Sequence, residues 1–139
     1  MFRYDETLPD FCDTLTWGMT IGQMKEFVKE HKTEASYSDN TLYIANIELH
    51  NFPGDCGALV LSGANIATAE SLAIAEDYAS RSGFSVIFST ICKGDVWVQA
   101  EVFKAAGYMT VDSYASNRNP ERTHVVVVRR IKKCIKKGY

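Results

Sequence analysis

The stretch with the clearest chemical potential is residues 61–69, LSGANIATA, which joins an apolar run to a predicted helix. A buried strand that leads through small residues into a helix N-terminus exposes free backbone N–H groups, and such a site attracts phosphate. The stretch carries neither a P-loop lysine nor a dinucleotide glycine triplet. Taken by itself it is therefore also typical of a tight turn that serves packing only.

The residues that could bind metal are scattered. No two of the four cysteines form a CxxC pair, and the three histidines are far apart in the sequence. These residues are Cys12, Cys56, Cys92 and Cys134, with His31, His50 and His124. The spacing favours four reduced cysteines in a cytosolic compartment and no metal site, over a zinc site or a disulfide.

Length and composition limit the class of protein. A chain of 139 residues with 46% hydrophobic and 23% charged residues is typical of one soluble globular domain. Its net charge of −2 disfavours a strongly basic nucleic-acid-binding protein, although six of its fifteen basic residues lie in the last eleven positions. The sequence contains no apolar run long enough to cross a membrane, and its acidic start does not resemble a signal peptide. We therefore expect a cytoplasmic protein.

Helical and strand patterns alternate along the middle of the chain. The patterns predict helices over 20–31, 68–81 and 96–106, and strands over 42–49, 56–62, 84–91, 108–114 and 123–131. A short strand is also suggested around 35–37. The continuous apolar run 58–61 is typical of a strand buried on both faces. This order predicts an α+β or α/β fold with a mixed sheet, in which strands 57–62 and 84–91 run parallel with helix 68–81 between them.

Residues 56–131 resemble the Gcn5-related N-acetyltransferase (GNAT) superfamily. The likeness rests on the order of CGALVLSG, a helix containing Leu72, FSVIFST, a helix that ends in VFKAAGY, and a final strand pair. It implies a GNAT-like mixed sheet flanked by helices, forming a single domain over residues 1–139. It also implies that strands 57–62 and 84–91 splay, the first at its C-terminal end and the second at its N-terminal end.

The resemblance implies acetyl-CoA as the cosubstrate. In such a protein the strand residues Leu59, Val60 and Leu61 would contact the pantetheine arm, and the following loop would hold the pyrophosphate through Asn65, Ile66, Ala67, Thr68 and Ala69. The chain departs from the family pattern at Ala64, where the polar loop residue is missing, and at Ala67, where a glycine is usual. Phe103 occupies the place of a tyrosine whose hydroxyl protonates the departing thiolate.

The reaction implied by the resemblance is attack of a neutral amine on a thioester, which requires a group that accepts the amine's proton. Glu48 is the first candidate, because its strand would neighbour the acyl site. His50 lies two residues further on and hence on the same strand face, and Asp55 is a third candidate. Tyr108 and Tyr114 are candidates to replace the missing tyrosine. Each of these residues is more typical of a solvated or packed position with no catalytic part.

Three functional hypotheses stay open at this point. The first is an N-acetyltransferase acting on a small-molecule or peptide amine that enters over the N-terminal helix. The second is a non-catalytic interaction or structural protein that kept the GNAT fold, similar to small proteins of tailed bacteriophages, which would act in the virion or the host cytoplasm. The third is an unrelated α+β binding domain. Among partners, a homodimer is open, and neither a membrane nor nucleic acid is expected.

Overall fold

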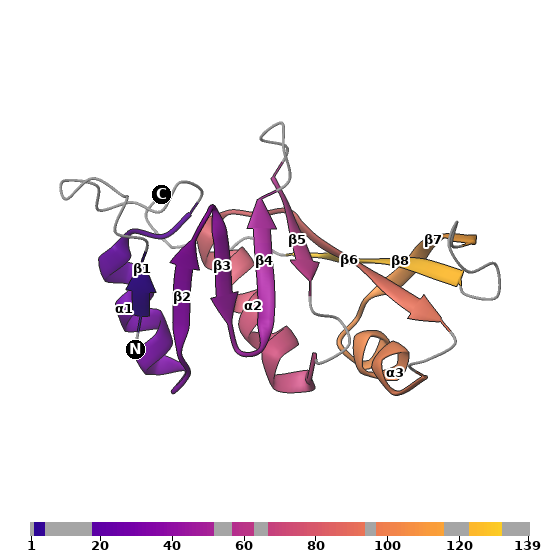
Figure 1. Ribbon diagram of the computed structural model, residues 1–139, viewed down its shortest axis with the longest axis horizontal. Helices are drawn as coiled ribbons and strands as arrows, with labels where there is room; N and C mark the ends of the chain where they lie inside the picture. Colours follow the sequence, from indigo (N-terminus) through magenta and orange to yellow (C-terminus); the bar gives the residue numbers. More distant parts are fainter. Residues whose placement is uncertain are drawn as a thin grey trace.

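The computed structural model describes residues 2–4, 18–51, 57–62, 67–93, 97–115 and 123–131. These residues form one mixed sheet of eight strands in the order β1-β2-β3-β4-β5-β6-β8-β7. The strands are β1 (Phe2–Tyr4), β2 (Ala35–Ser38), β3 (Thr41–Ile44), β4 (Ile47–Asn51), β5 (Ala58–Ser62), β6 (Val86–Lys93), β7 (Met109–Ala115) and β8 (Thr123–Arg130). The helices are α1 (Ile21–Glu30), α2 (Ala69–Ser82) and α3 (Trp97–Ala105). Figure 1 shows the sheet twisting along its length, with α1 near the β1 end and α3 near the β6–β8 end.

The central parallel pair is confirmed. β5 and β6 run parallel in the register Ala58↔Val86 to Val60↔Phe88, and α2 connects them. Because the pairing ends at Val60 and Phe88, both strands separate on their C-terminal sides. The expected splay at the N-terminal end of the second strand is therefore wrong, since two parallel strands can diverge only at corresponding ends.

The predicted strand 42–49 is in fact a hairpin of two strands. Ala45 and Asn46 have φ angles of 49° and 68°, and positive φ at both central residues produces the tight turn that joins antiparallel strands. Asp39 and Asn40 make the same kind of turn between β2 and β3, with φ angles of 51° and 62°. Neither turn contains glycine, so the usual composition signal was missing. β1 lies in the aromatic start of the chain, where the sequence favours either a strand packed on the core or a contact with a second subunit, and it adds parallel to β2 at the edge of the sheet.

The core lies between one face of the sheet and the helices. The side chains on this face are almost fully buried across four strands, β3 to β6, as shown by Leu42, Ile44, Ile47, Leu49, Leu59, Leu61 and Ile87. The helices cover them with residues such as Phe27, Leu72, Tyr78 and Phe103. On the other face Ala58 is buried and Val60 is partly exposed, so the expectation that the apolar run is buried on both faces holds at Ala58 and not at Val60. The sheet thus has a helix-covered face and a second face.

Capping accounts for where the helices begin and end. Thr20 and Gln23 form a capping box at the start of α1, and Thr68 and Ser71 form another at the start of α2. Gly83 ends α2 in the left-handed conformation at φ 84°, where a residue without a Cβ is favoured. None of the helices in the described part of the chain is long and apolar enough to cross a membrane.

Candidate active site on the second face of the sheet

A row of polar side chains crosses the second face of the sheet. Residues paired across strands share a face, and the registers place in one row Arg3, Ser36, Tyr43, Glu48 and Ser62. We call these five residues the polar row. An open groove of about 1040 Å³ follows the row from β1 to β4, with Arg3, Ser36, Tyr43 and Glu48 among its lining residues. The row ends at Ser62, two residues beyond Val60, which is the last residue of β5 that pairs with β6.

The point where β5 and β6 separate is stabilised by a buried serine. Ser89 of β6 is 1% exposed, and its hydroxyl donates a hydrogen bond of 2.7 Å to the Leu61 carbonyl. The backbone pairing of the two strands has ended one residue earlier, at Val60. A side chain thus satisfies a carbonyl that the neighbouring strand would otherwise pair with.

Glu48 and His50 lie together beside this separation. Their side chains are 45% and 36% exposed, and the Glu48 carboxylate lies 3.6 Å from Nε2 of His50. The expectation that they share a strand face is confirmed by the register, because Glu48 pairs with Ser62 and His50 with Val60. On the other side of the ring, Nδ1 of His50 lies 3.2 Å from the Thr41 hydroxyl. The pair combines a proton acceptor with a carboxylate at the surface of the sheet.

Tyr108 lies on the opposite, helix-covered face. Its side chain is 7% exposed and packs edge-on against Phe103, with ring centroids 4.9 Å apart. Burial raises the pKa of the Tyr108 hydroxyl above its ordinary value, the negative charge of Glu76 raises it further, and Arg129 opposes them. Glu48 and His50 are therefore separated from Tyr108 by the sheet itself. Phe103 is 1% exposed and belongs to the core.

The start of α2 is less open to a phosphate than the sequence suggested. The Thr68 N–H already donates to the Ser71 hydroxyl at 2.7 Å, and the Ser71 N–H donates to the Thr68 hydroxyl at 3.1 Å. Glu70 adds a negative charge in the first turn, where it opposes an anion. Ala67 is buried, while Ala69 is exposed. Asn65, Ile66, Ala64 and Asp55 lie outside the described residues, so their predicted roles stay predictions.

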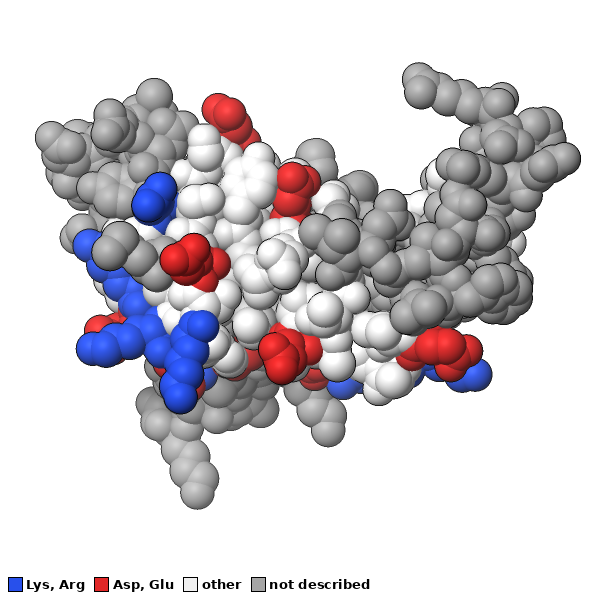
Figure 2. Space-filling model, turned by 60° about the horizontal axis from the view of Figure 1, so that its bottom comes forward, with Lys and Arg blue, Asp and Glu red and all other residues white. Residues whose placement is uncertain are grey.

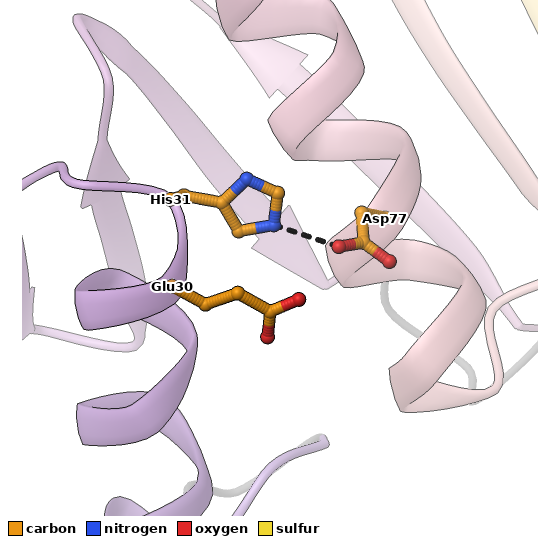
Figure 3. A group of neighbouring side chains, drawn as sticks. All are labelled: Glu30, His31 and Asp77. Carbon is orange, nitrogen blue, oxygen red and sulfur yellow. Dashed lines mark hydrogen bonds and ion pairs between the residues drawn. The ribbon is translucent and has the colours of Figure 1, made fainter.

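A second polar cluster joins α1 to α2. Glu30, His31 and Asp77 bring potential metal-ligand atoms within 4.8 Å of one another, and they are the one such group among the described residues. Figure 3 shows His31, at the end of α1, pointing to Asp77 on α2, with 2.7 Å between Nε2 and the carboxylate. Arg81 donates to both oxygens of Glu30, at 2.7 and 2.9 Å, and to Asp77 at 3.0 Å. The carboxylates are already paired, so the cluster holds the two helices together.

The charged side chains are unevenly distributed around the candidate site. In Figure 2, Lys and Arg gather mainly at the end of the molecule where α1 and β1 lie, whereas Asp and Glu are spread over the face that is seen. Four charged residues line the groove, with Arg3, Lys32 and Glu34 in one part and Glu48 in another. An ammonium group is therefore attracted to the Glu48 end of the groove.

Sequence reasoning found Glu48 and His50 but missed the residues around them. Thr41, Tyr43, Ser36 and Arg3 reach the site only because two hairpins and an edge strand fold beside β4. One signal in the sequence could have revealed the turn between β3 and β4. The apolar residues change from even positions, 42 and 44, to odd positions, 47 and 49, and such a change of phase indicates a turn between them.

Comparison with known proteins identifies the fold. No protein-family model matches the chain, and no curated protein is significantly similar in sequence. Solved structures are similar: an acetyltransferase of the GNAT family from Streptococcus pneumoniae has a TM-score of 0.53 at 14% identity, covering 82% of this chain and 78% of that one. The aminoglycoside 6′-N-acetyltransferase from Enterococcus faecium has a TM-score of 0.54 at 10% identity, covering 84% and 82%.

A third similar structure is the ribosomal-protein-S5-alanine acetyltransferase from Vibrio fischeri. Its TM-score is 0.50 at 11% identity, and the match covers 78% of this chain and 67% of that one. At such identities the likeness concerns the fold. This chain therefore has the GNAT acyltransferase fold, a mixed sheet with helices, as the sequence resemblance implied.

Proposed function

We propose that the protein is an N-acetyltransferase that transfers the acetyl group of acetyl-CoA to an amine. The observation that carries the proposal is the position of Glu48 and His50. Both stand on β4 and pair with Ser62 and Val60 of β5, where β6 ceases to pair, and Glu48 lines one end of the groove. A GNAT fold with a surface proton acceptor at this point has what acyl transfer to an amine requires.

The backbone of β5 and the start of α2 would hold acetyl-CoA. Leu59 and Leu61 have buried side chains, Leu59 pairs with Ile87 of β6, and the Leu61 carbonyl accepts from Ser89, so neither side chain nor that carbonyl is available to a ligand. In the first turn of α2, the N–H groups of Ala69 and Glu70 have no acceptor four residues earlier within the helix. The capping box and the charge of Glu70 weaken this end as a pyrophosphate site, and we therefore expect weak binding.

The chain's own residues would prepare the acceptor. Acetyl-CoA supplies the acetyl group as an activated thioester, and an amine attacks such a group only when it is neutral. An ammonium group in the groove would be attracted by Glu48 and would lose its proton to the Glu48–His50 pair. The acceptor class is an amine on a small molecule or a peptide, because the groove is open along the row from Arg3 to Glu48.

One observation favours a second candidate, a non-catalytic protein that kept the GNAT fold. Two N–H groups at the start of α2 are engaged by the capping box, and Glu70 repels anions there. Phe103, which has no hydroxyl, is buried in the core. A protein that never binds coenzyme A would tolerate all three features.

Binding of acetyl-CoA tests the site at the start of α2. A ligand selective for the native state raises the melting temperature, so the wild type should melt higher in millimolar acetyl-CoA. Glu70→Gln should enlarge this shift, because it removes a negative charge beside the expected pyrophosphate. Glu26→Gln, an equally exposed change on α1, is the matched control and should leave the shift as in the wild type.

Acetyl transfer distinguishes the two candidates. Incubation of the wild type with acetyl-CoA and a panel of amines and peptides should release free coenzyme A thiol. Glu48→Gln should reduce this release without lowering the melting temperature, because Glu48 is half-exposed. If no shift and no release occur with any amine, the enzyme proposal is wrong and the non-catalytic candidate stands.

A further inference from the structure

The contacts of Thr41 bear on which ring nitrogen of His50 carries the proton. The Thr41 hydroxyl lies within 3.2 Å of Nδ1 of His50, and also within 3.5 Å of the Asp39 carbonyl oxygen. The carbonyl can only accept a hydrogen bond, and the hydroxyl has one proton to donate. Both contacts are hydrogen bonds only if Thr41 donates to Asp39 and the His50 Nδ1–H donates to Thr41. Neutral His50 then has Nε2 unprotonated.

Thr41 is placed as a fixed support for the ring. It is 7% exposed, one of three buried polar residues in the described part of the chain, and it pairs directly with His50 across β3 and β4. Thr41 is the first residue of β3 and directly follows the tight turn at Asp39 and Asn40. A buried hydroxyl in a β-branched side chain has few rotamers, so its hydrogen bond restrains the orientation of the imidazole.

The other groups that face His50 are consistent with proton uptake at Nε2. Glu48 on its own strand places a carboxylate 3.6 Å from this nitrogen. Across the neighbouring strand lie Val60 and Ser62, which are uncharged, and Tyr43 lies opposite Glu48 on β3. Glu48 is thus the single charged side chain on β3, β4 or β5 that faces the ring, and its negative charge lies beside the positive charge that protonation creates.

We propose that Thr41 is a positioning residue that holds His50 in the Nδ1–H tautomer, so that Nε2, facing Glu48, accepts the proton of the acceptor ammonium. This inference rests on the proposed function. In the step, an N–H bond of the ammonium breaks, its electron pair stays on the amine nitrogen, and the proton forms the Nε2–H bond. The resulting imidazolium is stabilised by the Glu48 carboxylate and later releases the proton to solvent.

The tautomer can be measured on the free protein. Nitrogen-15 NMR distinguishes protonated from unprotonated imidazole nitrogens, and the chain has only three histidines, so His50→Gln identifies the signals of His50. We expect the wild type, at a pH where His50 is neutral, to show Nδ1 protonated and Nε2 unprotonated. Thr41→Val, which keeps the shape and removes the hydroxyl, should give a mixture of tautomers, and Thr41→Ser should restore the wild-type pattern.

The rate of acetyl transfer should depend on the tautomer of His50. His50→Gln should lower kcat about 100-fold or more, as expected for loss of a general base. Thr41→Val should lower it roughly tenfold with KM unchanged, and Thr41→Ser should recover most of the loss. Signals of His31 that match those of the wild type show that a variant has folded.

The outcomes separate this inference from the proposed function. If the wild type shows Nδ1 unprotonated, or if Thr41→Val leaves the tautomer unchanged, the role assigned to Thr41 is wrong even when acetyl transfer is observed. If the wild type transfers no acetyl group, the proposed function is wrong, and the assignment of Nε2 as the proton acceptor is overturned with it.

Discussion

The residues that matter most at the candidate site are uncharged ones that satisfy a neighbour's hydrogen bonds. Ser89 supplies a donor to the Leu61 carbonyl where the backbone pairing of β5 and β6 has ended. Thr41 supplies an oxygen to His50. In both cases a buried hydroxyl replaces a backbone partner or fixes a ring, and the exposed groups Glu48 and His50 depend on that support.

Ser89→Ala should destabilise the protein by about 1–2 kcal/mol, because it leaves a buried carbonyl without a donor. Ser85 offers a control, since its side chain is exposed and its backbone N–H, which donates to the Gly57 carbonyl at 2.8 Å, is unaffected by Ser85→Ala. Urea unfolding of the two variants measures the difference. Equal midpoints for Ser89→Ala and the wild type would show that the hydroxyl contributes nothing to joining the strands.

Among the elements, the contact between α1 and α2 combines charge and packing. Phe27 and Tyr78 meet edge-on at 6.1 Å, and the Arg81 guanidinium lies 5.4 Å from the Phe27 ring centre. The Arg81 hydrogen bonds hold the pKa of Glu30 below its ordinary value of 4.5. The two helices are thus joined by an aromatic pair beneath a set of ion pairs at the surface.

This contact predicts a dependence of stability on pH. Because folding lowers the pKa of Glu30, its contribution is fully present above about pH 4.5 and is lost as the pH falls through the lowered folded value. The wild type should therefore melt higher than Glu30→Gln at pH 7, and the two melting temperatures should converge near pH 3. Thermal melts at several pH values measure this. A constant difference down to pH 3 would contradict the role given to the Arg81–Glu30 pair.

Secondary structure could be predicted where local signals agree with the fold. The capping residue Thr20, the αL position of Gly83 and the apolar face of α2 identified α1 and α2 to within one or two residues. Hairpins without glycine could not be predicted in this way, because Ala45 and Asn46 adopt positive φ under the influence of strand pairing. β1 is only three residues long and acquires its conformation from β2.

The candidate site could likewise be predicted only where it depends on local sequence patterns. Glu48 and His50 follow from alternation within one strand, which is a local property. Thr41, Ser36 and Arg3 reach the site through registers between strands, and these depend on turn lengths that sequence patterns do not specify. Tyr108 could not be placed in this way, because its packing against Phe103 of α3 is what buries it on the face away from Glu48.

At the scale of the whole molecule, the sheet divides the protein into a side that stabilises it and a side available for chemistry. The helix-covered face carries the large buried residues, whereas the second face carries half-exposed polar ones. In a GNAT fold whose two sheet faces are divided in this way, the residues of the polar row can be substituted with little effect on the core. The division explains how a chain only 10–14% identical to similar acetyltransferases keeps their fold.

Substitution of two neighbouring residues of β5 tests this division. Leu59 is 0% exposed on the helix-covered face, so Leu59→Ala should cost about 2–5 kcal/mol through lost burial and the cavity it leaves. Val60 is half-buried on the second face, and Val60→Ala should cost about 1 kcal/mol, since less apolar surface is removed from water there. Chemical denaturation of both variants gives the comparison. A cost for Val60→Ala equal to that for Leu59→Ala would mean that the second face is packed as tightly as the first, which would leave no room there for an acceptor amine beside His50.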